Sequence, residues 1–138
     1  MFLIDTNVWL ELLLEQDKSG DVRQFLQAIE GHLLAITDFS VYSIGIILTQ
    51  LKKDVLFEDF LSDTIEDSGV KRIYLDSTDL KKLLIVRKRF NLDFDDAYQY
   101  VSAEKYGLTL ISFDSDFDRT ERDENFPLKF QVVDQYPF

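Results

Sequence analysis

The sequence contains no cysteine, which excludes disulfide bonds and catalysis by a thiolate. It contains two prolines, Pro127 and Pro137, so the rest of the chain has no proline to interrupt its helices and strands. The one histidine, His32, is expected in a surface loop, so a mechanism based on acid–base catalysis by histidine is not favoured. No apolar run approaches the roughly 18 residues that span a bilayer, and no basic segment precedes the apolar N-terminal stretch. We therefore expect a cytoplasmic protein without a membrane segment.

Basic side chains are also scarce. The chain has 15 Lys and Arg against 26 Asp and Glu, a net charge of −11. Such a charge repels polyanions at long range, and nucleic-acid-binding proteins are more often basic. The composition is 46% hydrophobic in 138 residues, which is enough to build one ordinary core. We expect a single domain over residues 1–138, whose charge argues against nucleic-acid binding unless it is offset locally.

Short apolar runs alternate with segments of helical periodicity. The apolar runs predict strands at 1–4, 33–36, 70–75, 108–112 and 131–133. The periodic segments predict helices at 7–15, 21–30, 39–52, 54–67, 77–90 and 96–106. The expected helix boundaries are Gly31 and Gly107 as stops, Asp38 as a cap, and Ser77 or Thr78 as a cap. This alternation predicts a three-layer α/β/α fold with a mostly parallel sheet of about five strands.

Acidic side chains follow two of these strands and precede one helix. Asp5 comes directly after the first strand, and Asp114 and Asp116 follow the fourth. A third set lies at the start of the helix over 96–106 and comprises Asp93, Asp95 and Asp96. In parallel sheets ligands bind at the carboxyl ends of the strands, so we expect Asp5, Asp96 and Asp114 to meet at one edge.

Converging carboxylates repel one another unless a cation neutralises them. Mg²⁺ prefers oxygen ligands, and such an ion can activate a water and stabilise charge on a phosphodiester. The pattern therefore predicts a Mg²⁺ or Mn²⁺ site. Each acid also has an ordinary alternative role: Asp5 as a helix N-cap, Asp95 as a cap or a first-turn charge, and Asp114 and Asp116 as solvated loop residues.

Three segments together resemble the PIN domain family, especially the small VapC-type toxins of toxin–antitoxin systems. They are LIDTNVWLELL, DFDDAYQYVSAEKYG and LTLISFDSDFD, in this order. The resemblance covers nearly the whole chain and implies a PIN-like fold. It also implies an endoribonuclease that uses Mg²⁺ or Mn²⁺ to hydrolyse RNA. The partners that it implies are a cognate antitoxin and a second copy of the chain in a homodimer.

The resemblance also implies roles for particular residues. Catalysis falls to Asp5, Asp96 and Asp114, and the metal ligands are these three acids with Asp116. The choice between Asp95 and Asp96 as the ligand stays open. Hydrogen bonds that orient the acids are expected from Thr6, Asn7, Ser43 and Ser112.

One family feature is missing from the helix after the second strand. Members place a glutamate there, in a run resembling S-x-x-x-x-x-E-L, whereas this chain reads TDFSVYSIGIILTQL. The position falls among Tyr42, Ser43, Ile44 and Gly45, which carry no charge. Two hypotheses follow: an active ribonuclease with a reduced set of acids, or an inactive PIN-like module that binds a partner. A third is a metal-assisted enzyme acting on another phosphate substrate, although the chain lacks a Gly-rich phosphate loop.

Two surface features bear on binding. A basic cluster that could guide a phosphate chain towards the metal comprises Lys81, Lys82, Arg87, Lys88 and Arg89. The alternative is an ordinary solvated helix face. Phe57 falls off the inward face of the helix over 54–67, which suggests a surface for a basic antitoxin tail or a second copy, with burial in the core as the alternative.

Overall fold

The computed structural model describes residues 1–114 and 128–129. Its strands are β1 (Phe2–Ile4), β2 (Leu34–Thr37), β3 (Lys71–Ile73), β4 (Thr109–Ser112) and β5 (Leu128–Lys129). Its α-helices are α1 (Thr6–Leu13), α2 (Ser19–Gln27), α3 (Asp38–Gln50), α4 (Asp54–Phe60), α5 (Ser77–Phe90) and α6 (Phe94–Tyr106). A 3₁₀ turn, η1 (Gly31–Leu33), precedes β2, and a π-helix, η2 (Leu61–Asp67), continues α4.

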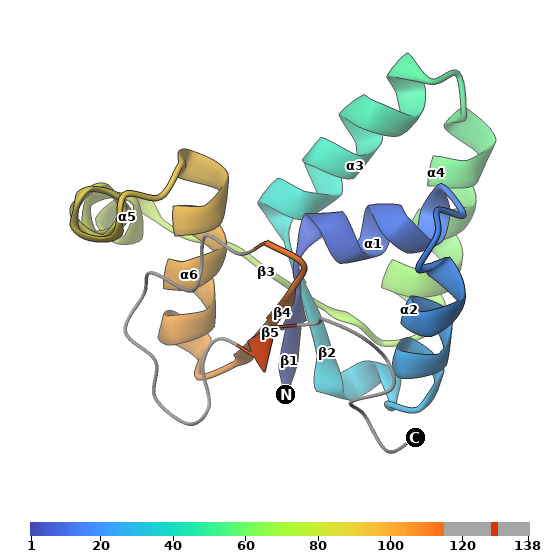
Figure 1. Cartoon of the computed structure of the whole chain (residues 1–138), viewed down its shortest axis with the longest axis horizontal. Coiled ribbons are helices and arrows are strands. Elements are labelled where there is room, and N and C mark those ends of the chain that lie inside the picture. Colours follow the sequence, from blue (N-terminus) through green and yellow to red (C-terminus); the bar gives the residue numbers. More distant parts are fainter. Residues whose placement is uncertain (115–127, 130–138) are drawn as a thin grey trace.

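The strands form one sheet in the order β3-β2-β1-β4-β5, and each neighbouring pair is parallel. Helices α1 to α4 cover one face of the sheet, and α5 and α6 cover the other (Figure 1). The predicted three-layer α/β/α fold with a parallel sheet of about five strands is therefore confirmed. The fifth strand lies at Leu128–Lys129. The segment predicted for it, 131–133, lies outside the described residues, as does Asp116.

Each face of the sheet carries its own hydrophobic core. Successive strand residues point to opposite faces, so Leu3 joins the cluster under α5 and α6 whereas Ile4 joins the cluster under α1 to α4. Trp9 and Phe25 fill the second cluster and are about 2% exposed. Full burial of side chains of this size contributes roughly 1.5–3 kcal/mol each. Both faces of the central strands are covered, which is why β1 and β2 are continuous apolar runs in the sequence.

The predicted helix starts and caps are wrong by one or two residues. Thr37, not Asp38, caps α3 by accepting a hydrogen bond from the Ser40 amide (3.0 Å). Asp76, rather than Ser77 or Thr78, caps α5. Helix α6 begins at Phe94 instead of 96, because the Asp93 carboxylate accepts from the Asp96 amide (2.9 Å). A cap needs an extended backbone and an acceptor that reaches the first-turn amides, and in each case the earlier polar residue meets both conditions.

The segment predicted as one helix over 54–67 divides into α4 and the π-helix η2. Phe57 is half-buried in the core under α1 to α4, where its ring lies against Gly45 of α3. A Cβ atom on Gly45 would lie 2.8 Å from the Phe57 ring, so the glycine makes room for it. The hypothesis that Phe57 forms an exposed partner surface is therefore wrong.

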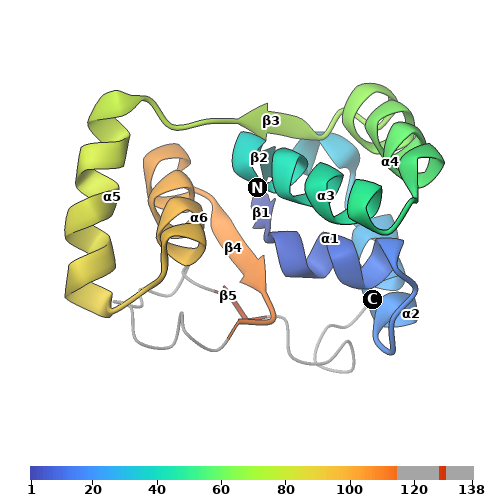
Figure 2. The same ribbon diagram turned by 90° about the horizontal axis from the view of Figure 1, so that it is seen from above.

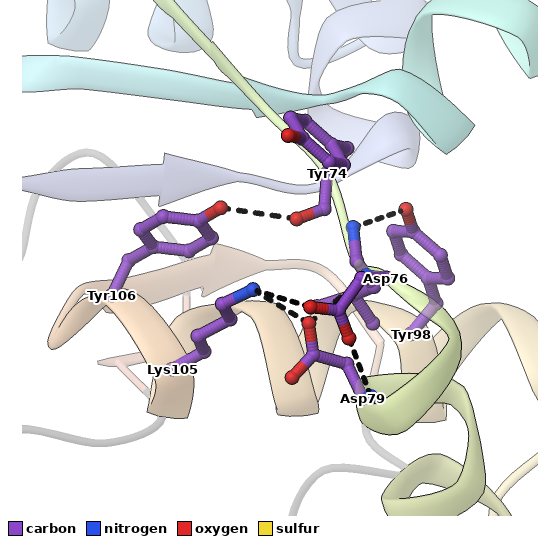
Figure 3. Close-up of polar contacts among 7 residues, drawn as sticks. Tyr74, Asp76, Asp79, Tyr98, Lys105 and Tyr106 are labelled. Atoms are coloured by element: carbon purple, nitrogen blue, oxygen red, sulfur yellow. Dashed lines mark hydrogen bonds and ion pairs between the residues drawn. The ribbon is translucent and has the colours of Figure 1, made fainter.

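Polar contacts fix α6 against the segment between β3 and α5 (Figure 3). The Tyr98 hydroxyl accepts from the Leu75 amide (3.0 Å), and the Tyr106 hydroxyl donates to the Tyr74 carbonyl (3.0 Å). Lys105 forms an ion pair with Asp79, with a nitrogen–oxygen distance of 2.6 Å. These contacts hold the helix that carries Asp96 at both its middle and its end. Among the helices that the structure describes, none has the length and apolarity needed to cross a membrane.

Candidate active site

A cavity of about 430 Å³ opens at the carboxyl ends of β1 and β4. It is lined by Asp5, Thr6, Asn7, Leu10, Ser43, Ile46, Ile47, Asp93, Asp95, Asp96, Gln99 and Asp114. These residues come from the ends of β1 and β4 and from α1, α3 and α6. The structure thus brings Asp5, Asp96 and Asp114 together, as the strand order predicted. Five carboxylates line the cavity, and its described lining includes no basic side chain.

Asp5 lies at the bottom of this cavity and is 5% exposed. Its Oδ1 accepts from the Thr6 amide (2.8 Å) and from the Gln99 side-chain amide (2.9 Å). Its Oδ2 accepts from the Ser112 hydroxyl (2.6 Å). Burial raises the pKa of Asp5, and these three hydrogen bonds oppose that rise. Asp5 therefore caps α1 and also presents a fixed carboxylate to the cavity, so capping does not exclude the metal-ligand role, which stays a prediction.

Ser112 joins β4 to the Asp5 carboxylate. Its hydroxyl donates to Asp5, and its oxygen accepts from the Asp114 amide (2.9 Å) and, at 3.5 Å, from the Asn7 side chain. The Asn7 side-chain oxygen in turn accepts from the Phe113 amide (3.3 Å). These contacts hold the start of α1 beside the chain that leaves β4. Asn7 and Ser112 thus form hydrogen bonds of the kind expected of residues that orient the acids. Their effect on activity stays a prediction.

A second group of polar side chains supports Asp5 from α3 and α6. The Gln99 amide nitrogen donates to Asp5 Oδ1 and to the Ser40 hydroxyl (2.8 Å), and its oxygen accepts from the Thr37 hydroxyl (3.0 Å). Thr6 and Ser40 hydrogen-bond through their hydroxyls (2.7 Å). Thr37 fixes the orientation of the Gln99 amide, because a hydroxyl donating to the oxygen leaves the nitrogen facing Asp5. The network links three elements that are remote in sequence.

Asp96 is the second buried carboxyl group of the cavity, and its pKa is strongly raised. It is 6% exposed, and its Oδ2 has no hydrogen-bonding partner among the described residues. Burial raises its pKa to about 9, and contact with the Asp114 carboxyl and repulsion from Asp93 and Asp5 add to the effect. A carboxyl group so placed retains a proton near neutral pH unless a positive charge approaches it. Asp96 is therefore the acid of α6 best placed to accept a cation.

Asp93 and Asp95 lie at the rim of the same cavity, and both are exposed. One carboxylate oxygen of Asp93 already accepts the hydrogen bond that caps α6. Partial burial and the nearby Asp93 raise the pKa of Asp95. The geometry favours Asp96 over Asp95 as the ligand, because Asp96 is buried next to Asp114 whereas Asp95 is open to solvent.

The opposite wall of the cavity comes from α3. Ser43 lies there, half-exposed, with Ile46 and Ile47 beside it. This is the place where the family resemblance expects a glutamate, and the α3 wall accordingly supplies a hydroxyl and no carboxylate. Ser43 lines the cavity but makes no hydrogen bond to Asp5, so the orienting role expected for it stays a prediction.

The basic cluster predicted to bind substrate lies on α5, in the outer layer of the molecule. All five of its side chains are exposed, and none lines the cavity. Helix α6 lies between α5 and the sheet (Figure 2). Lys82 forms an ion pair with Glu104 at 2.6 Å, which is ordinary for a solvated helix face. A substrate role for Lys81, Lys82, Arg87, Lys88 and Arg89 stays a prediction.

The donor set suits a hard divalent cation. Among the described residues, no three acidic or histidine side chains are close enough to form a preassembled ligand set. The cavity nevertheless offers the fixed Asp5 carboxylate, the unpartnered Asp96 Oδ2 and the half-buried Asp114. Oxygen donors, excess negative charge and an unsatisfied buried oxygen are what Mg²⁺ or Mn²⁺ would neutralise. The residues therefore fit such an ion.

Gln99, Thr37 and Ser40 were missed by the sequence reasoning. All three are buried: Gln99 is 2% exposed, and Thr37 and Ser40 are 0% exposed. The available signal was a glutamine one helical turn after Asp96, on the same face of the predicted helix. A buried polar side chain requires partners, and here the partner is the first acid of the site.

Comparison with known proteins places this geometry in a family. The model of the PIN domain family matches residues 2–123. A comparison with curated protein sequences finds no match.

Several solved structures share the fold. A toxin–antitoxin complex from Klebsiella pneumoniae is 18% identical, with 93% of this chain and 97% of that chain covered and a TM-score of 0.72. VapC20 from Mycobacterium tuberculosis, described as a Sarcin–Ricin loop cleaving toxin, is 14% identical, with coverages of 86% and 93% and a TM-score of 0.71. FitAcB from Neisseria gonorrhoeae is 20% identical, with coverages of 86% and 92% and a TM-score of 0.70. At these identities the likeness establishes the fold.

Proposed function

Because the chain belongs to the PIN domain family, we propose that it is a divalent-metal-dependent endoribonuclease that hydrolyses RNA phosphodiester bonds. The observation that carries the proposal is Asp96, whose buried Oδ2 has no hydrogen-bonding partner among the described residues and lies in a cavity with Asp5 and Asp114. The part of the cavity lining that the structure describes contains no basic side chain. Mg²⁺ or Mn²⁺ would be held by these three acids, and Asp116 is the fourth candidate. When bound, the ion would lower the pKa of a water and stabilise charge on the phosphodiester.

The chain's own residues would prepare the site for that chemistry. The Asp5 carboxylate is held by three donors, so its free lone pairs keep one direction. Asp96 gives up the proton that it holds near neutral pH when positive charge enters the cavity, because the repulsion and burial that raise its pKa are then offset. Leu10, Ile46 and Ile47 supply an apolar rim that limits water at the acids.

We further propose that the protein works as a cytoplasmic toxin held by a cognate antitoxin, and that it forms a homodimer. The support is the family membership together with the fold shared with proteins solved as toxin–antitoxin complexes. A partner that neutralises the acidic cavity with a basic segment would suit the net charge of −11.

The second candidate function is a PIN-like module that binds a partner without catalysis. The observation that favours it is Ser43, which leaves the α3 wall of the cavity without a carboxylate. Fewer negative ligands would lower the affinity for the ion.

A ribonuclease assay separates the two functions. Purified protein should cleave single-stranded RNA in Mn²⁺, and cleavage should vanish in chelator and in Asp96→Asn. Asp95→Asn is the matched control and should retain most of the activity. Cleavage that persists in both chelator and Asp96→Asn would contradict the proposal. Absence of cleavage by the wild type, with activity restored by Ser43→Glu, would establish the inactive module.

A further inference from the structure

The Gln99 side chain reaches the cavity from α6 in one fixed orientation. It is 2% exposed, and both hydrogens of its amide nitrogen are used, one on Asp5 Oδ1 (2.9 Å) and one on the Ser40 hydroxyl (2.8 Å). Its oxygen accepts from the Thr37 hydroxyl (3.0 Å). Turning the amide over would place its oxygen against the Asp5 carboxylate, so that two acceptors would face each other. Movement of the amide away from Asp5 would also break its hydrogen bonds to Thr37 and Ser40.

The hydrogen bonds of Asp5 leave its two oxygens unequal. Each carboxylate oxygen has two lone pairs that can accept a hydrogen bond or bind a cation. Oδ1 accepts from the Thr6 amide (2.8 Å) and from Gln99, so both of its lone pairs are occupied. Oδ2 accepts from the Ser112 hydroxyl (2.6 Å), and the residues that the structure describes supply it with no second donor. Asp5 therefore has one lone pair, on Oδ2, to offer to a cation.

The number of oxygens that a carboxylate offers distinguishes Mg²⁺ from Ca²⁺. Mg²⁺ requires a small octahedral shell, keeps several waters and is bound through one or two carboxylates. Ca²⁺ takes roughly 6–8 oxygen ligands, and carboxylates that bind through both oxygens help to fill its larger shell. The α3 wall adds no carboxylate to such a shell, because Ser43 lines the cavity there. Restricting Asp5 to one oxygen therefore disfavours Ca²⁺ more than Mg²⁺.

We propose that Gln99 determines which divalent cation the cavity accepts. By donating to Asp5 Oδ1, it limits Asp5 to a single bond to the ion and so selects Mg²⁺ or Mn²⁺ over Ca²⁺. The inference rests on the proposed function, because it requires Asp5 to be a ligand of the ion. Gln99 acts through Asp5 and is therefore a positioning residue. A glutamine that only satisfies the hydroxyls of Thr37 and Ser40 would affect stability but not the choice between the two ions.

The test measures the relative affinity of the full chain for Mg²⁺ and Ca²⁺. Each ion displaces bound Mn²⁺, and the released Mn²⁺ is measured by its electron paramagnetic resonance signal. The ratio of the two dissociation constants is the readout, because a general loss of affinity leaves it unchanged. The wild type should bind Mg²⁺ more tightly than Ca²⁺. Gln99→Met keeps an unbranched side chain of similar length without an N–H donor, and it should shift the ratio towards Ca²⁺ by about 10- to 100-fold.

Two further variants separate selectivity from stability. Val101→Ala truncates a buried side chain of α6 that packs in the cluster under α5 and α6, so it should lower the Tm and leave the ratio unchanged. Gln99→His retains an N–H donor and should keep most of the preference for Mg²⁺. Thermal unfolding verifies that each variant is folded. An unchanged ratio in Gln99→Met would overturn the inference, and so would a wild type that binds Ca²⁺ as tightly as Mg²⁺, a result that needs no variant.

The inference and the proposed function fail in different ways. If the wild type binds Mn²⁺ and cleaves RNA but Gln99→Met keeps the wild-type ratio, the role of Gln99 is wrong and the ribonuclease stands. If Gln99→Met shifts the ratio yet the wild type cleaves no RNA in Mn²⁺, the ribonuclease is wrong and the role of Gln99 stands. If the wild type binds no Mn²⁺, both are wrong.

Discussion

Asp96→Asn should stabilise the protein in the absence of divalent metal, although it abolishes the proposed activity. The pKa of Asp96 is raised to about 9 in the folded protein, so the folded state binds more protons than the unfolded state. Stability gained from a raised carboxyl pKa is present at low pH and is lost as pH rises from about 4 towards 9. At pH 7 this linkage costs up to about 4 kcal/mol, at 1.36 kcal/mol for each pKa unit.

Asparagine removes the titration and keeps the shape of the side chain, and its amide can donate to Asp114. We therefore expect Asp96→Asn to gain about 2–4 kcal/mol at pH 7, which corresponds to about 6–14 °C in Tm for a domain of this size. Thermal unfolding in chelator at pH 5, 7 and 9 measures this gain. The wild-type Tm should fall across the series, and the variant Tm should fall less.

Asp95→Asn is the control for this prediction. The two residues are adjacent in the first turn of α6, but Asp95 is exposed, so its substitution should change stability by less than about 0.5 kcal/mol. A lower Tm for Asp96→Asn at pH 7 would show that the raised pKa of Asp96 does not destabilise the folded protein. So would a variant Tm that follows pH with the same slope as that of the wild type. Saturating Mn²⁺ should reverse the order of the two proteins, because only the wild type would retain all three ligands.

Three other changes test the metal site, the support of Asp5 and the packing of α3. Mn²⁺ affinity, measured by calorimetry, should rise up to about tenfold per pH unit between about pH 6 and 8, because binding displaces the Asp96 proton; affinity independent of pH would contradict this. Gln99→Leu should weaken Mn²⁺ binding about 10- to 100-fold, because Asp5 would lose the hydrogen bond from the Gln99 amide, and Gln99→His should cause a smaller loss. If Gln99→Leu binds Mn²⁺ as tightly as the wild type does, Gln99 only contributes to packing. Gly45→Ala should lower the free energy of unfolding by about 1–3 kcal/mol in denaturant titrations, because its Cβ atom would lie 2.8 Å from the Phe57 ring. Gly20→Ala is the control and should not lower the free energy of unfolding, because its Cβ atom would meet no atom within 4 Å.

The order of layers was predictable from sequence because the strands are buried on both faces. Continuous apolar runs such as residues 1–4 and 33–36 occur when helices cover both sides of a parallel sheet. The meeting of Asp5 and Asp114 followed from the same topology, since β1 and β4 are neighbours that end at one edge. Residues 96 to 103 are all buried, so helical periodicity could not show which side chain of α6 faces Asp5.

The errors arose where local sequence does not determine structure. The caps at Thr37 and Asp76 are chosen by backbone conformation among several adjacent polar residues, so each candidate nearby was about equally suitable. The environment of Phe57 depends on Gly45, twelve residues earlier, whose missing side chain admits the ring. The role of Gln99 depends on contact with Asp5 across 94 residues of sequence. Such long-range pairs become visible only once the chain is folded.

The proposed function requires that the carboxylates of Asp5, Asp96 and Asp114 bind the divalent cation on which RNA hydrolysis depends. Crystals of the full chain grown with Mn²⁺, with anomalous diffraction measured near the manganese edge, test this requirement. We expect an anomalous peak within bonding distance of oxygens from all three residues, which disappears in Asp96→Asn. The absence of a peak at the cavity, or a peak bound without Asp5 and Asp96, would contradict it.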